Sequence, residues 1–180
     1  MKTRVINFVA APSSGKSLMA ALIFSELKMK HYSAEYVQEY AKQLIWQGRL
    51  DELANQYNVS LEQYKMIKAV DGQVDYICLD SPLVLGLYYN RHHPENVCDI
   101  RKTERMILSK ISEFDNIYIF LERNEEYPYE TQGRIHTEEQ SRVISQELLQ
   151  MMNSLGIEYR CFRSDRKNVA AILDYIASFS

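Results

Sequence analysis

The sequence is poor in the features that mark exported, metal-stapled or membrane-spanning chains. It has only three cysteines, an odd number without the paired spacing of zinc or redox motifs: Cys78, Cys98 and Cys161. No run approaches the roughly 20 apolar residues that cross a bilayer, and no secretory cleavage pattern follows the short apolar run after residues 1–4. We therefore expect a cytoplasmic protein with reduced thiols and no membrane contact.

An excess of positive charge is also lacking. The chain carries 21 Lys and Arg against 24 Asp and Glu, which gives a net charge of −3. A duplex-binding protein normally concentrates Lys and Arg on one face to displace counterions, so this balance disfavours DNA as a partner. The one candidate basic patch is the segment 91–105, with Arg91, Arg101, Lys102 and Arg105.

Short β-rich runs alternate with longer helical runs along the chain, which favours a parallel sheet with helices on its faces. Strands are predicted at residues 4–10, 34–37, 76–79, 117–121 and 157–162. Helices are predicted near residues 16–30, 41–46, 60–70, 100–113, 137–155 and 169–179. We predict an α/β fold in a single domain over residues 1–180, in three layers, with a five-stranded, mostly parallel sheet and helices on both faces.

Local signals mark several helix ends and one long loop. Two capping-box patterns predict helix starts, Ser60 with Gln63 and Thr137 with Gln140. Gly156 has the position of a C′ glycine. Residues 122–136 are rich in charge and include Pro128 and Gly133, which predicts a loop on the rim of the sheet. We interpret this loop as a lid over about residues 122–142.

The segment from Ala10 to Ser17 matches G-x-x-x-x-G-K-[ST], with Ala in place of the first Gly. In this motif a helix N-terminus and successive backbone N–H groups converge on the phosphates, Lys16 faces the β and γ groups, and Ser17 offers its hydroxyl to Mg²⁺. Ala10 must have a negative φ, because a Cβ is costly in the left-handed region. The loop lies between a buried strand and an amphipathic helix, as a P-loop NTPase fold requires. The predicted ATP-binding residues here are Ala11, Pro12, Ser13, Ser14, Gly15, Lys16, Ser17 and Leu18.

A second signal is the apolar strand 76–79, which ends at Asp80. A carboxylate at the carboxyl end of a strand beside the phosphate loop can hold Mg²⁺, directly or through water. Many strands end in Asp because a turn begins there, so the pattern alone has two interpretations. Together with the loop it predicts a Mg²⁺ site formed by Ser17 and Asp80, with Lys16 and Asp80 as catalytic residues.

Three further segments carry recognisable patterns, namely residues 36–41 (YVQEYA), 79–83 (LDSPL) and 128–134 (PYETQGR). With the phosphate loop, they make the chain resemble the small P-loop kinases of NAD metabolism. These are the NadR-like ribosylnicotinamide kinase domains of bacteria and phages, with the AAA-type ATPase/kinase group around them. The resemblance covers most of the chain. It implies ATP-dependent transfer of the γ-phosphoryl group to a hydroxyl of a small nucleoside-like acceptor, ribosylnicotinamide in that family, with Mg²⁺ as cofactor.

Glu39 follows the second predicted strand. Its carboxylate would therefore lie at the same rim as Ser17 and Asp80, where it could orient an acceptor hydroxyl or take its proton. The spacing fits a solvated glutamate at a helix start equally well. The resemblance implies a contact with the acceptor sugar, and on that basis Glu39 is a catalytic candidate.

Arginines near the lid could stabilise charge on the transferring group. The candidates are Arg134, as a catalytic residue, then Arg142, as an ATP-binding residue, and Arg123. The rim departs from the family, which usually has aspartate where this chain has Gln132. Residues 164–168 occupy the place where such kinases wrap the adenine, so Asp165 is a further ATP-binding candidate, although a polar turn would look the same.

Two alternatives stay open. The same machinery could phosphorylate another nucleoside, a nucleotide or a hydroxymethylated base within DNA, and a duplex acceptor would need an open cleft and local basic residues. In a different class, a nucleotide-dependent switch would hydrolyse ATP slowly and report its state to a partner. A switch requires neither a lid with arginines nor an acidic residue placed for an acceptor.

Overall fold

A computed structural model of the chain describes residues 2–129 and 137–179. The strands in these ranges are β1 (Arg4–Val9), β2 (Ala34–Val37), β3 (Tyr76–Leu79), β4 (Asp115–Glu122) and β5 (Arg160–Arg163). The α-helices are α1 (Lys16–Met29), α2 (Tyr40–Trp46), α3 (Leu50–Leu53), α4 (Gln56–Lys68), α5 (Leu83–His92), α6 (Ile100–Ile111), α7 (Glu138–Ser154) and α8 (Val169–Ala177). A 3₁₀ turn, η1 (Arg166–Asn168), precedes α8.

The five strands form one sheet in the order β2-β3-β1-β4-β5, and every pairing between them is parallel. The predicted α/β fold with a five-stranded sheet is confirmed. β1 lies at the centre, and residues 5–9 of this strand are buried. Because the strands run in one direction, their carboxyl ends meet at one edge, where α/β sheets bind ligands.

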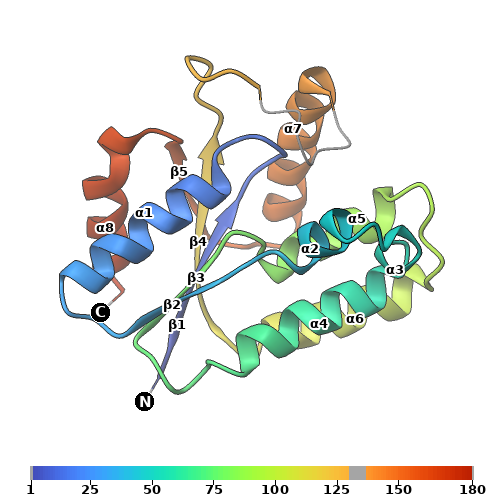
Figure 1. The fold of residues 1–180 in the computed structure, drawn as a ribbon, viewed down its shortest axis with the longest axis horizontal. Helices are drawn as coiled ribbons and strands as arrows, with labels where there is room; N and C mark the ends of the chain where they lie inside the picture. Colours follow the sequence, from blue (N-terminus) through green and yellow to red (C-terminus); the bar gives the residue numbers. More distant parts are fainter. Residues whose placement is uncertain (1, 130–136, 180) are drawn as a thin grey trace.

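Alternate residues of the central strand contribute to two separate cores. Val5 and Val9 pack with residues of α4, α5, α6 and α7, whereas Ile6 and Phe8 pack with residues of α1 and α8. Figure 1 shows the same division, with α1 and α8 on one face of the sheet and the larger group of helices on the other. The three-layer prediction is therefore confirmed. Within residues 2–129 and 137–179, no helix is both long and apolar enough to cross a membrane.

Helix α4 begins earlier than predicted. Its N-cap is Asn55, whose side chain accepts a hydrogen bond from the backbone N–H of Asn58 at 3.0 Å, and Asn is among the strongest N-cap residues. Ser60 and Gln63 consequently lie inside the helix, where both are buried. The capping box predicted at Ser60 is wrong, and the two side chains are available for tertiary contacts.

Helix α5 was not predicted, because its sequence has no amphipathic period. Its residues 83–85, 87 and 88 are all buried, so apolar side chains surround the helix on every side and the 3.6-residue pattern disappears. Gly86 allows close packing here: a Cβ at this position would lie 2.7 Å from the Ser60 Oγ and 3.1 Å from Ile107 Cδ1. Helix α5 therefore packs closely against both α4 and α6 at Gly86.

The elements after residue 136 follow the prediction closely. The capping box of Thr137 and Gln140 is present at the start of α7, and Gly156 has the positive φ of 63° that a C′ glycine adopts. The last strand starts at Arg160 instead of residue 157. The delay has a local cause, because the N–H of Ile157 still donates to Met152 O at the helix end.

Candidate active site

The phosphate loop connects β1 to α1 at the carboxyl edge of the sheet. Two of its residues adopt positive φ, Ser13 at 56° and Gly15 at 82°. Ala10 is not among the described residues with positive φ and is fully buried. Ala10 therefore avoids the left-handed region, as the sequence requires of an alanine at this position, and the loop needs no glycine there.

Gly15 is required for a second reason besides its φ. A Cβ added to it would lie 2.0 Å from the Oγ of Ser164, in the turn that follows β5. Ser164 is buried, and its Oγ has no hydrogen-bond partner among the residues the structure describes. The turn assigned to adenine thus packs against the phosphate loop through Ser164. Asp165 instead caps η1, since its side chain accepts from the N–H of Lys167 at 2.9 Å.

Lys16 is folded back over the loop. Its side chain is buried, and its Nζ donates to Ala10 O at 3.0 Å and to Ala11 O at 3.2 Å. These hydrogen bonds hold the ammonium group over the loop that precedes α1. From this position its positive charge could contact a phosphate group bound in the loop. Leu18, in contrast, is half exposed.

Ser17, Asp80 and Tyr36 form a hydrogen-bonded cluster at the ends of three elements. The Asp80 Oδ2 accepts from the Ser17 hydroxyl at 2.9 Å and from the Tyr36 hydroxyl at 2.8 Å. Burial, and then the charge of Asp80, raises the pKa of Tyr36 well above its usual value, so the phenol stays protonated and remains a donor. The structure brings Ser17 and Asp80 together, as the sequence predicts, and adds Tyr36 from β2.

This cluster fits a magnesium ion. Asp80 is 4% exposed, and its Oδ1 has no hydrogen-bond partner within the described parts of the chain. A buried carboxylate oxygen left unpaired is costly unless a cation or water compensates it. A carboxylate and a hydroxyl are also the oxygen ligands that Mg²⁺ takes from proteins beside phosphate oxygens. Ser17 and Asp80 are therefore the residues that would hold it.

The contact of Tyr36 with Asp80 leads to a prediction. In Tyr36→Phe the Asp80 Oδ2 loses one of its two donors, so the carboxylate should be less well oriented. We expect the Mg²⁺ concentration for half-maximal nucleotide binding to rise by about 10-fold, the usual size of an outer-shell effect. Titration of Mg²⁺ against bound nucleotide measures it. Tyr32→Phe, which changes a half-exposed tyrosine, is the control, and equal Mg²⁺ titrations for the two variants would contradict the role of Tyr36.

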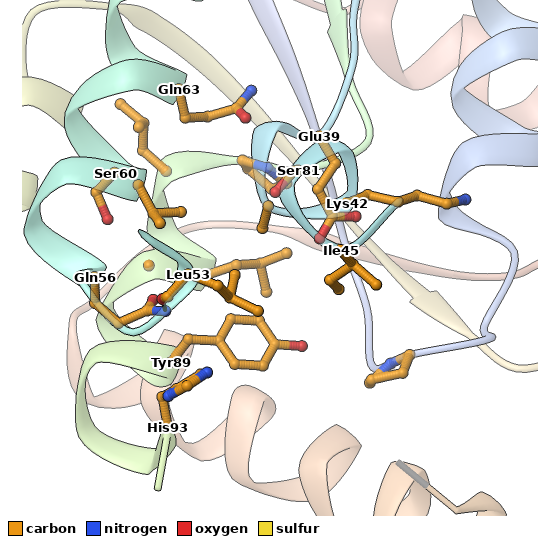
Figure 2. A pocket seen from close by; sticks show the side chains of 17 residues that line it. Glu39, Lys42, Ile45, Leu53, Gln56, Ser60, Gln63, Ser81, Tyr89 and His93 are labelled. Carbon is orange, nitrogen blue, oxygen red and sulfur yellow. Dashed lines mark hydrogen bonds between the residues drawn. The ribbon is translucent and has the colours of Figure 1, made fainter. Parts of the chain in front are cut away.

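Glu39 lies on the wall of a cleft that reaches the phosphate loop. It is the N-cap residue of α2 and is half-buried. The same cleft is lined by Pro12 of the loop and by Ser81, which follows Asp80. The structure therefore places Glu39 and the loop residue Pro12 on the wall of the same cleft, and Figure 2 shows the Glu39 side chain beside Ser81 and Lys42 at one end of it.

The cleft is a partly open pocket. Its cavity volume is about 110 Å³, and further space within it opens to solvent. Its far end is formed by α4 and α5, where Gln56, Tyr89 and His93 are grouped in Figure 2. The sequence did not identify this end of the cleft, because it depends on helix α5.

Of the three arginine candidates, the structure describes Arg123 and Arg142, and both pair with acidic side chains. Arg134 and Gln132 lie outside the described residues. Arg142 is 64% exposed and pairs with Glu138 at 3.2 Å. Arg123 also pairs with Glu138, and its guanidinium donates to Tyr127 O at 3.2 Å.

One contact links α7 to the phosphate loop. The Ser141 hydroxyl, at the start of α7, donates to Pro12 O at 2.6 Å. Ser141 is buried, and nothing in the local sequence marks it. Helix α7, which carries Arg142, is therefore hydrogen-bonded to the phosphate loop.

The candidate basic patch is partly neutralised. Arg91 forms an ion pair with Glu104 of α6. Lys102 lies over the Tyr57 ring, with its Nζ 5.6 Å from the ring centre. The segment 91–105 therefore does not present an uninterrupted basic face, which weakens the case for a duplex DNA acceptor.

Comparison with known proteins gives one family and a shared fold. A model of the AAA domain family matches residues 5–167. The structure is similar to that of the Mycobacterium tuberculosis APS kinase CysC in complex with AMPPNP and APS, with a TM-score of 0.51, 12% identity and 98% of each chain covered. A cysteine-to-alanine mutant of that kinase has a TM-score of 0.44 at 15% identity, over 85% of this chain and 99% of that one. A search of curated proteins finds no match.

Proposed function

Because the chain belongs to the AAA domain family, a group of P-loop NTPases, we propose that it is an ATP-dependent kinase. Its acceptor is a small nucleoside-like molecule with a free hydroxyl, and ribosylnicotinamide is the first compound to test. One observation carries the proposal: Glu39 and Pro12 line the same cleft. An acceptor in that cleft would meet the phosphate loop at its acidic end.

At the nucleotide end, residues 11–18 bind the triphosphate. Lys16 turns its ammonium from the two loop carbonyls toward the β- and γ-phosphates. Ser17 and Asp80 would hold Mg²⁺, which would neutralise charge on the phosphate oxygens. Tyr36 keeps the carboxylate of Asp80 in place through its hydrogen bond.

At the acceptor end, Glu39 orients the attacking hydroxyl and accepts its proton. The cleft has mixed chemistry that suits an acceptor without phosphate groups. Among its described lining residues, Lys42 is the one Lys or Arg, whereas sites for phosphate groups usually converge several cations or a bidentate arginine. A nucleoside is therefore favoured over a nucleotide. Assignment of Arg134 to the transferring group stays a prediction from the sequence.

The fold is compatible with this chemistry. The APS kinase that shares it was solved with an ATP analogue and its acceptor together. Both ligands in this protein would occupy the carboxyl edge of the sheet, the nucleotide on the loop before α1 and the acceptor between α2, α4 and α5.

Changing Glu39 to Gln tests the acceptor end. The variant should bind ATP as the wild type does, because Glu39 is not one of the proposed ATP-binding residues 11–18. Its kcat for the preferred nucleoside should fall by about 10²–10⁴-fold, the contribution of a general base. Steady-state kinetics with separate titrations of ATP and acceptor measure the two effects.

Glu35→Gln is the matched control, since Glu35 is an exposed glutamate on the preceding strand β2. It should leave both titrations unchanged. Wild-type kcat and acceptor KM in Glu39→Gln would remove Glu39 from the reaction and leave it as a helix-start residue.

A further inference from the structure

The side chain of Gln63 brackets Glu39 from both sides. Its Oε1 accepts from the N–H of Tyr40 at 2.9 Å, and its Nε2 donates to the carbonyl of Gln38 at 3.2 Å. Gln63 comes from α4, is 5% exposed and lines the acceptor cleft together with Glu39. Both partners are backbone groups of the residues immediately before and after Glu39.

The two hydrogen bonds fix the connection between β2 and α2. Only Gln38 and Glu39 lie between the end of that strand and the start of that helix. The N–H of Tyr40 belongs to the first turn of α2 and has no partner within the helix. A helix of seven residues is too short to form by itself. The amide of Gln63 therefore supplies a cap that the local sequence does not provide.

The orientation of the Gln63 amide is also determined. A backbone N–H can only donate and a backbone carbonyl can only accept, so Oε1 must face Tyr40 and Nε2 must face Gln38. Exchanging the two atoms would break both hydrogen bonds. The contact is thus specific to glutamine, and an apolar side chain of the same size would lose it.

On this geometry we propose that Gln63 is a positioning residue that sets the Glu39 carboxylate relative to the acceptor hydroxyl. The inference rests on the proposed kinase function. Gln63 acts through the backbone of residues 38–40 and makes no contact with the reacting atoms. Because a misplacement of about 1 Å can cost about 10²-fold in rate, loss of this bracket should weaken catalysis through Glu39.

Gln63→Met is the first variant, because methionine has a similar volume and cannot form either hydrogen bond. We expect kcat/KM for the acceptor to fall by about 10–100-fold, with ATP affinity within about twofold of the wild type. In the Glu39→Gln background the same change should have almost no further effect, because coupled residues are not additive. If Gln63→Met is unstable, Gln63→Leu replaces it.

Hydrogen exchange at the Tyr40 amide provides a readout without turnover. The rate should rise at least about 10-fold in Gln63→Met, because that N–H loses its acceptor. Gln56→Met is the matched control for this measurement. Gln56 is an equally buried glutamine of α4, but its side chain donates to Leu53 O at 2.8 Å, so the Tyr40 amide should exchange as in the wild type.

The outcomes separate the two claims. Unchanged acceptor kinetics in Gln63→Met, or an equal loss in the Glu39→Gln background, overturns the positioning role while the kinase function stands. A wild-type protein that phosphorylates no acceptor overturns the proposed function itself, whatever the Tyr40 exchange rate shows.

Discussion

The Lys16→Ala protein should fold normally and transfer no measurable phosphoryl group. Lys16 is buried with its Nζ between two carbonyls of the loop, so the variant removes the one ammonium that the motif supplies to the β- and γ-phosphates. Loss of a single preorganised charge or donor in an active site costs about 10²–10³-fold or more in rate. Initial rates with the preferred acceptor, together with ATP binding by calorimetry, measure the effect.

Lys65→Ala is the control for that variant, because Lys65 is an exposed lysine paired with Glu62 on α4. It should retain full activity. Circular dichroism shows whether the Lys16 variant keeps its fold. Undiminished transfer by a folded Lys16→Ala protein would mean that residues 10–17 do not bind the triphosphate.

Asp80→Asn should reduce phosphoryl transfer by a comparable amount, because the variant should bind Mg²⁺ more weakly. The substitution keeps the shape of the side chain but removes the charge, and it adds two N–H donors beside the Ser17 and Tyr36 hydroxyls. We expect kcat to fall by at least about 10²-fold. The Mg²⁺ concentration that supports half-maximal ATP binding should rise by at least about 10-fold.

The same strand offers a matched control. Asp75 precedes β3 at its other end, is half-buried, and accepts hydrogen bonds from the N–H and hydroxyl of Ser33. These hydrogen bonds lower the pKa of Asp75 without any link to the site. Asp75→Asn should leave the Mg²⁺ titration unchanged. If Asp80→Asn also leaves it unchanged, Asp80 is only the first residue of a turn.

The sequence predicts the layers of the fold well, because buried parallel strands are short apolar runs. The strands 34–37 and 76–79 have the predicted bounds. Helix α5 escaped prediction because burial on all sides removes its period, and with it the far end of the cleft was missed. Local patterns work where one face of an element meets solvent and fail where none does.

The candidate site divides in the same way. The loop residues and the Ser17–Asp80 contact follow from a motif and from strand order, so the sequence contains them. Gln63 was misread as part of a capping box at the start of its own helix. It caps α2 instead, 23 residues earlier, and only tertiary structure brings these two helices together. The Tyr36 contact was within reach, because Tyr36 and Asp80 lie near the carboxyl ends of neighbouring strands.

The central claim is that ATP on the loop and an acceptor in the cleft react together. The most direct test is ATP turnover with γ-labelled ATP, measured with and without an acceptor panel of ribosylnicotinamide, common nucleosides, nucleoside monophosphates and hydroxymethylated DNA. We predict that one nucleoside without phosphate groups accelerates turnover and acquires the label on its hydroxyl. Slow ATP hydrolysis at the same rate with every acceptor, and no labelled product, would contradict a kinase and indicate a nucleotide-dependent switch.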